Sequence, residues 1–231
     1  MKSLLVVFLA CSIYCGAQKQ DIRILNGLDP VISRFAVTGQ PALETLLELS
    51  RNENLSFGII VDGSGLCNSR ITYDGSNVPL TVLLNSVVTQ IPGYKWQQTN
   101  PKIIMVGPLS PRPVTEHFLG LTDRQYGPIN ANIQTLGTVL WVHIRSILHP
   151  DQGTAGDILS STNDRVFAID EQNASIKHIL NRIAIASKGT WVLKPLPTKL
   201  ADAGQAVPFA ILSGSERFGP ALNDICTMET H

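Results

Sequence analysis

The sequence predicts an α+β fold with two small β-α-β-type modules, each with helices packed on short mixed sheets. Apolar residues make up 44% of the 231 residues and charged residues only 16%, a composition that favours a packed core over disorder. Helical and strand periodicities alternate along the chain, and one strand-helix-strand pattern occurs twice. The formal net charge is zero, so there is no electrostatic signature of nucleic-acid binding.

The N-terminus has the features of a secretory signal peptide over residues 1–17. Lys2 supplies the positive charge, an apolar stretch too short to span a bilayer follows, and Gly16 and Ala17 suit cleavage after Ala17. We therefore expect an exported protein, periplasmic or secreted if bacterial, with no transmembrane span in the mature chain. The alternative is a lipoprotein anchored at Cys11, because residues 8–11 loosely resemble a lipobox.

Two cysteines, Cys67 and Cys226, remain after cleavage. An even number of cysteines in an oxidising compartment permits one disulfide. Cys67 and Cys226 are therefore a candidate disulfide, and two unpaired thiols are the alternative.

After a lead-in at 18–34, the first module is predicted over 35–107. Its clearest element is a helix over 80–91, where apolar residues recur at helical spacing until Pro92 and Gly93 end it. Short apolar runs bounded by turn residues predict the strands. The expected elements in order are a strand at 35–37, a helix from Pro41, strands at 57–61 and 70–73, the helix at 80–91, and a hairpin of 94–97 and 102–106.

A proline-containing linker is expected at 108–130, a second module at 131–195 and an extended tail at 196–231. The second module begins with a helical stripe over 133–148, and Ser175 is expected to cap its other helix. Strands are predicted at 158–159, 165–169 and 190–193, and within the tail residues 207–212 could add one edge strand.

The two modules share residues at their corners. Asn77, Leu84, Asn85 and Gly93 recur 96 positions later as Asn173, Leu180, Asn181 and Gly189, and Arg70 and Trp96 recur 95 positions later as Arg165 and Trp191. Recurrence at offsets of 95 and 96 positions indicates an internal repeat. Two independently arising β-α-β units are the alternative.

Residues 35–106 resemble the short N-terminal domain of secretins and TonB-dependent receptors, the STN domain. The resemblance is carried by the leucine-rich stretch at 42–50, Val61-Asp62, the stretch at 77–84 and Gly93-Tyr94-Lys95-Trp96. Residues 163–195 resemble the second half of the same domain. The resemblance implies a non-enzymatic periplasmic domain that docks partner proteins.

A search for chemistry yields no expected catalytic, cofactor or metal site. His143 and His149 are six residues apart, which places them on different helix faces, and Asp62-Gly63-Ser64-Gly65 is interpreted as a plain turn. No Ser-centred nucleophile elbow is present.

The sequence therefore favours an exported envelope protein that acts as a protein-binding adaptor or scaffold. Its partner is expected to be another envelope protein, with no nucleic acid and no cofactor. A small-ligand carrier or a hydrolase with an unrecognised site is the alternative. Because the edges of small sheets recruit partner strands, the last strand of the first module is the candidate docking edge. Its residues are Lys102, Ile103, Ile104, Met105 and Val106.

Overall fold

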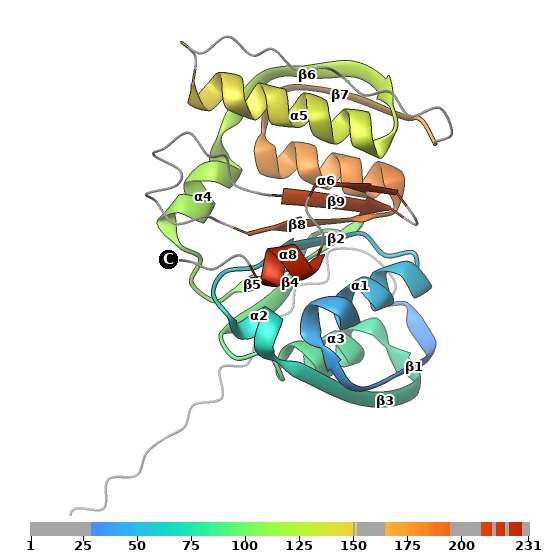
Figure 1. Ribbon diagram of the computed structural model, residues 1–231. Coiled ribbons are helices and arrows are strands. Elements are labelled where there is room, and N and C mark those ends of the chain that lie inside the picture. Colours follow the sequence, from blue (N-terminus) through green and yellow to red (C-terminus); the bar gives the residue numbers. More distant parts are fainter. Residues whose placement is uncertain are drawn as a thin grey trace, which may run out of the picture.

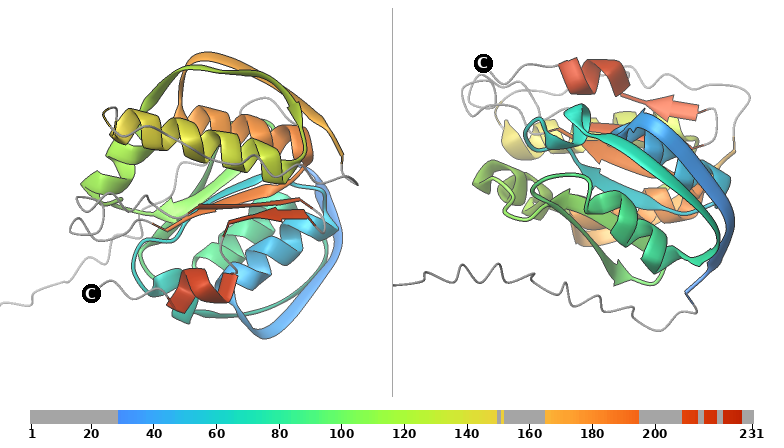
Figure 2. Two further views of the ribbon diagram at one scale, coloured as in Figure 1. Left: turned by 45° about the horizontal axis from the view of Figure 1, so that its top comes forward. Right: turned by 90° about the horizontal axis from the view of Figure 1, so that it is seen from below.

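The computed structural model describes residues 29–149, 151, 165–194, 209–213, 216–219 and 222–227. Five layers are stacked in it, with one central sheet, a helix layer on each face, and a two-stranded ribbon outside each helix layer (Figure 1). The two ribbons lie at opposite ends of the stack (Figure 2). The α+β class with mixed sheets predicted from the sequence is confirmed.

The N-terminal half of the fold, from Val31 to Pro108, contains two core helices, a ribbon and three strands of the central sheet. Helix α3 begins at Leu80, as the apolar periodicity predicts, and buries Leu83, Leu84 and Val87. The elements are β1 (Val31–Pro41), α1 (Ala42–Asn52), β2 (Phe57–Ile60), α2 (Gly65–Asn68), β3 (Arg70–Pro79), α3 (Leu80–Val88), β4 (Tyr94–Asn100) and β5 (Ile103–Pro108).

The C-terminal half, from Pro113 onward, repeats the ribbon, the two helices and a hairpin. The side chain of Ser175 accepts a hydrogen bond from the backbone of His178, which confirms Ser175 as the cap of its helix. The elements are α4 (Pro113–Gly120), β6 (Thr122–Ala131), α5 (Ile133–Leu148), β7 (Phe167–Ser175), α6 (Ile176–Ser187), β8 (Thr190–Leu193), β9 (Phe209–Ser213), β10 (Glu216–Phe218) and α8 (Leu222–Thr227).

The central sheet has the strand order β10-β9-β8-β2-β5-β4, so each half of the chain contributes three adjacent strands. Strand β2 pairs in parallel with β5 on one side and with β8 on the other. The hairpins β4–β5 and β8–β9 are antiparallel. The two modules predicted from the sequence therefore share one principal sheet, which the sequence pattern did not indicate.

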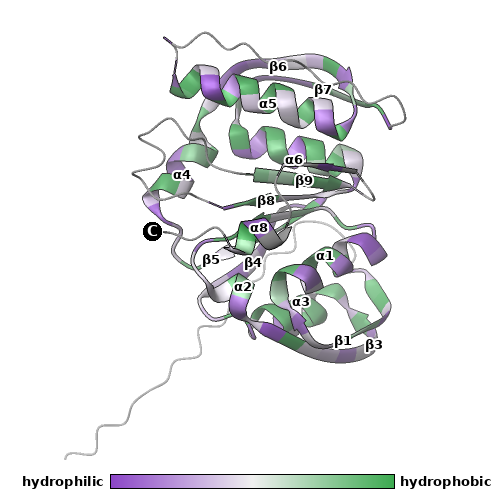
Figure 3. Cartoon of the chain, in the orientation of Figure 1, coloured by the Kyte–Doolittle hydropathy of each residue, from purple (hydrophilic) through white to green (hydrophobic). Residues whose placement is uncertain are grey.

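Each half packs its own helices on its own face of the shared sheet. The face formed by Phe57, Ile59 and Val106 belongs to one core with α1 and α3. The opposite face, including Met105 and Trp191, belongs to a second core with α5 and α6. In Figure 3, β9 is coloured almost uniformly hydrophobic, as expected for a strand covered on both faces.

The repeated residues have equivalent backbone angles and hydrogen bonds in the two halves. Asn77 and Asn173 both have left-handed backbone angles, with φ of 54° and 49°. The indole N–H of Trp96 donates to Asn85 Oδ1 at 2.9 Å, and the indole N–H of Trp191 donates to Asn181 Oδ1 at the same distance. The corresponding ribbons, β1–β3 and β6–β7, are both antiparallel and each contains one register shift. The repeat is thus present in structure as well as in sequence.

Three predicted boundaries are wrong. Strand β1 begins at Val31, inside the predicted lead-in, because its register with β3 extends to Val31 and Pro79. The predicted linker at 108–130 contains α4 and β6. The described part of the predicted tail forms β9, β10 and α8, since apolar residues such as Ile211 and Ile225 are fully buried. The predicted strand at 158–159 lies outside the described residues.

Among the described residues, the helices are all too short or too polar to cross a membrane.

Candidate binding site

The predicted docking edge is wrong, because β5 lies inside the sheet. Ile103 to Val106 pair with β4 on one side, and Ile104 to Val106 pair with β2 on the other. Lys102 lies in the turn between β4 and β5. The prediction assumed that the last strand of a hairpin is an edge, whereas the chain places the earlier strand β2 beside it.

The edge of the sheet on this side is β4. Within the described residues, no strand pairs with the outer side of β4. Leu109 N–H donates to Gly93 C=O, and Ile104 N–H donates away from β4 to Ser56 C=O. Because inward and outward backbone groups alternate along a regular antiparallel pair, the N–H and C=O groups of Trp96, which precedes the register shift between Gln97 and Asn100, point outward. Strand β4 therefore offers backbone groups to a partner strand.

An open groove of about 620 Å³ lies alongside β4. Ile60, Met105 and Gly107 line it from the sheet, Glu116 and Leu119 from α4, and Ser175 and Lys177 from the start of α6, while Lys95 and Gln97 line it from β4. The half-exposed Leu109 lies at the groove as well. Apolar groups beside two lysines and one glutamate suit an extended peptide with apolar and acidic side chains.

Burial lowers the pKa of Lys177 below the ordinary lysine value. A lysine that is partly removed from water gains more from a bound carboxylate than a fully solvated lysine does. Lys177 is therefore the groove residue best suited to hold an acidic side chain.

A cluster of polar side chains joins the sheet to α4 beside the groove. The Asp62 carboxylate forms an ion pair with the Arg112 guanidinium and accepts the backbone N–H of Arg112 at 3.0 Å. Thr115 Oγ1, at 3.5 Å, also donates to Asp62. The Asp62 side chain is only 7% exposed. Asp62 therefore positions the start of α4, and with it one wall of the groove. The sequence interpretation of Asp62 as a turn residue missed this role.

Tyr94, the first residue of β4, belongs to the same cluster. Its hydroxyl accepts the backbone N–H of Asp62 and donates to the Asp62 carbonyl, both at 2.9 Å. Burial, which is the largest cause, raises the pKa of Tyr94 to about 12. Burial together with the positive charge of Arg112 lowers the pKa of Lys194. The two hydrogen bonds of the Tyr94 hydroxyl fasten the start of β4 to the segment that follows β2.

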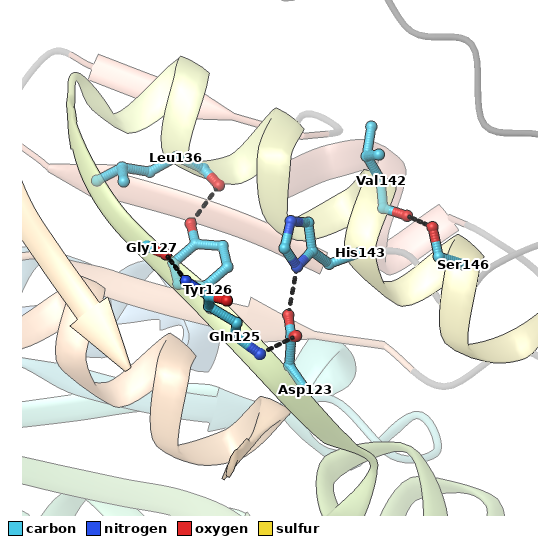
Figure 4. Close-up of polar contacts among 8 residues, drawn as sticks. All are labelled: Asp123, Gln125, Tyr126, Gly127, Leu136, Val142, His143 and Ser146. Atoms are coloured by element: carbon cyan, nitrogen blue, oxygen red, sulfur yellow. Dashed lines mark hydrogen bonds and ion pairs between the residues drawn. The ribbon is translucent and has the colours of Figure 1, made fainter. Parts of the chain in front are cut away.

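An Asp-His pair occurs elsewhere, between β6 and α5. His143 Nδ1 lies 2.6 Å from the Asp123 carboxylate, which also accepts the backbone N–H of Gln125 (Figure 4). The buried Tyr126 hydroxyl donates to Leu136 C=O at 2.6 Å, and burial followed by the charge of Asp123 raises its pKa. Among the described residues, no hydroxyl or thiol is hydrogen-bonded to His143. The pair fastens the outer ribbon to α5, and helix periodicity alone could not reveal Asp123 as its partner.

A second histidine pair lies on the surface of the C-terminal half. Glu171 contacts His178 Nε2 at 2.9 Å and Arg182 Nε at 2.6 Å. The His178 side chain is 54% exposed, so it lies on a solvated face of α6. Exposed pairs of this kind contribute little to stability.

The candidate disulfide is present. Cys67 in α2 is bonded to Cys226 in α8, with their Cα atoms 5.5 Å apart. The bond fastens the C-terminal segment to the N-terminal half, where Ile225 is buried in the core. The predicted signal cleavage after Ala17 and the alternative anchor at Cys11 lie outside the described residues.

Comparisons of this chain with known proteins find no matching family model, no similar curated protein and no similar solved structure. The resemblance of residues 35–106 to the STN domain therefore stays a prediction from the sequence.

Proposed function

We propose that this protein is an adaptor of the cell envelope that binds another protein by accepting an extended segment of it along β4. The observation that carries the proposal is the outer side of β4, where the backbone of Trp96 faces no strand among the described residues and lies beside the groove. Addition of a strand to a sheet edge is a common mode of peptide recognition.

The composition of β4 supports this assignment. Lys95 and Gln97 are polar and lie on the groove side, while Trp96 between them is 4% exposed. Charged and polar residues on an edge strand suppress uncontrolled pairing between edges. Such an edge favours a specific partner, whose side chains must match the lysines of the groove.

Export is part of the proposal. The Cys67–Cys226 disulfide supports it, because structural disulfides persist in oxidising compartments and are rare in the cytosol. The predicted signal peptide supports it independently.

The test is affinity capture from an envelope extract with three forms of the protein: wild type, Gln98→Pro and Gln98→Ala. Proline replaces the N–H at position 98 of the edge strand by a ring that disturbs strand addition, whereas alanine keeps the N–H. We expect one partner to be retained by wild type and by Gln98→Ala and lost with Gln98→Pro.

Both variants must unfold in urea at the wild-type midpoint, so that loss of binding is not loss of folding. Equal capture by a folded Gln98→Pro protein would exclude the β4 edge as the binding site. Capture of no protein by any form would contradict the adaptor function and favour the carrier or hydrolase alternatives.

A further inference from the structure

From the internal repeat we infer which strand β4 accepts: a segment that runs parallel to β4, has a glycine opposite Trp96, and carries an acidic side chain next to that glycine. The inference rests on the proposed function and specifies the partner of the same site. It follows from the fact that the chain already fills the equivalent position in its C-terminal half.

Strand β8 corresponds to β4 in the repeat, with Trp191 equivalent to Trp96 and β9 equivalent to β5. The side of β8 away from β9 is occupied by β2, which pairs in parallel and places Gly58 opposite Trp191. Phe57 N–H donates to Gly189 C=O, and Val61 N–H donates to Leu193 C=O. The equivalent side of β4 is the open one.

The backbone groups at the two tryptophans agree. Trp191 faces β2, and the 95-residue offset maps Trp191 onto Trp96. Trp96 is the residue of β4 whose N–H and C=O both point outward, since it precedes the register shift between Gln97 and Asn100. A strand that pairs with β4 in the manner of β2 therefore finds a donor and an acceptor at Trp96.

The glycine requirement comes from the tryptophan. A Cβ atom on Gly58 would lie 2.5 Å from Cζ2 and 2.6 Å from Cε2 of Trp191, which is closer than carbon atoms can approach. Each tryptophan is held by its asparagine, Asn85 or Asn181, at 2.9 Å. Trp96 therefore presents the same obstacle to a side chain paired with it, and glycine avoids it.

The acidic requirement comes from the groove. Residues on either side of the paired glycine point to the opposite face of the sheet from Trp96, which is the face lined by Lys95 and Lys177. Glu116 is the one acidic side chain among the described residues that line the groove. An acidic partner residue beside the glycine is therefore favoured over a basic one.

The test uses a blocked synthetic peptide with the sequence of residues 55–62 of this chain and the substitution Phe57→Glu, added to the full mature protein. We expect the amide NMR signals of Trp96 and Gln98 to shift and their hydrogen exchange to slow. A nitroxide on the peptide N-terminus should broaden the Tyr94 amide more than the Asn100 amide, as parallel pairing requires.

Two matched peptides test the side-chain rule. Adding Gly58→Val should weaken binding by about tenfold or more, and replacing the glutamate by lysine should also weaken it. The protein variant Lys95→Glu should reverse the preference between the glutamate and lysine peptides.

Failure of the peptide to bind, equal binding of the Gly58→Val peptide, or broadening at Asn100 would each overturn the pairing rule. The proposed function would still stand if wild type and Gln98→Ala capture the envelope partner and Gln98→Pro does not. Hydrogen exchange at the Trp96 amide could also slow when only the protein concentration is raised and no peptide is added. That result would identify a second copy of this chain as the occupant and overturn the rule for a separate partner.

Discussion

Strands β4 and β8 are equivalent in the repeat but differ in their surroundings. Strand β8 lies between β2 and β9 and is buried over all four residues, whereas β4 pairs with β5 alone among the strands that the structure describes. Their sequences differ accordingly. Thr190, Trp191, Val192 and Leu193 of β8 correspond to Lys95, Trp96, Gln97 and Gln98 of β4.

The comparison shows that the same contact between tryptophan and asparagine occurs in an interior strand and in an edge strand. The tryptophan and its asparagine are kept in both halves because they fasten the strand to its own helix. The residues around the tryptophan differ because a strand covered on both faces must be apolar, while an edge strand needs polar groups. Both halves thus share the contact between tryptophan and asparagine. The outer side of β8 pairs with β2, whereas the outer side of β4 pairs with no described strand.

The largest expected effect comes from releasing the segment that covers β8. Strand β9 belongs to the C-terminal segment that Cys226 joins to Cys67 across 159 positions. Replacing both cysteines by serine should lower the free energy of unfolding by about 4 kcal/mol, because the bond restricts the unfolded chain. Urea unfolding followed by circular dichroism measures the loss.

Reduction of the wild type with a thiol serves as the control for the serine substitutions. Hydrogen exchange should become faster at the amides of β8 and remain unchanged at β4. An equal increase at both strands would contradict the assignment of the C-terminal segment as a cover of β8.

High pH should weaken a contact that β4 has and β8 lacks, since β8 (Thr190–Leu193) contains no tyrosine comparable to Tyr94. The Tyr94 pKa of about 12 exceeds its ordinary value of 10. Between pH 10 and 12 the unfolded state loses this proton while the folded state keeps it, so stability is fully present below pH 10 and falls as pH rises.

For Tyr94, the contribution lost between pH 8 and pH 11.5 is about 2 kcal/mol. The Tyr94→Phe variant should lack it, and the difference between wild type and variant in urea unfolding, measured from pH 8 to pH 11.5, isolates it from other groups. A difference that does not change with pH would contradict the buried, hydrogen-bonded state of this hydroxyl.

One methyl group added at Gly58 should weaken the pairing between β2 and β8. The substitution Gly58→Ala should cost about 2 kcal/mol, because its Cβ would overlap the Trp191 ring in a packed interior. Gly107→Ala is the matched control, since its Cβ would lie 3.5 Å from Ile60, an ordinary contact. Equal midpoints for the two variants in urea would contradict the tight pairing of β2 with β8.

The smallest expected effects distinguish the two tryptophans. Asn181→Ala should cost about 2 kcal/mol and Asn85→Ala about 1 kcal/mol, because each leaves an indole N–H without its acceptor. The difference arises because Trp191 is fully buried, while Trp96 is 4% exposed at the edge. Thermal and urea unfolding of both variants measure the order, and the reverse order would indicate that the β4 edge is covered in solution.

Local patterns predicted much of this fold. The apolar periodicity placed α3, α5 and α6 near their observed positions, Ser175 was recognised as a cap, and the repeated asparagines and tryptophans marked equivalent corners. These features depend on neighbours within a helical turn or a strand, so the sequence carries them directly. The Cys67–Cys226 pair was a candidate from the count of cysteines outside the predicted signal peptide, and the structure decided between a bond and two free thiols.

The candidate site depended on contacts between distant residues, which explains why its predicted location was wrong. Asp62 and Arg112 are 50 positions apart, and Asp123 and His143 are 20 apart on different elements. No periodicity brings such pairs together. The same holds for the groove, whose walls come from β4, β5, α4 and α6.

By itself, the sequence determined the main core helices, most strands of the central sheet and the repeated asparagine and tryptophan positions. Only the tertiary structure decided which strand is an edge, because that depends on what pairs with β2. Strand β2 joins β5 to β8, so the strand predicted to be free became interior and its hairpin partner was left open. Hydrogen-bonding groups are nearly the same in every strand, and their pairing is selected by the packing of side chains on the two faces of the whole sheet.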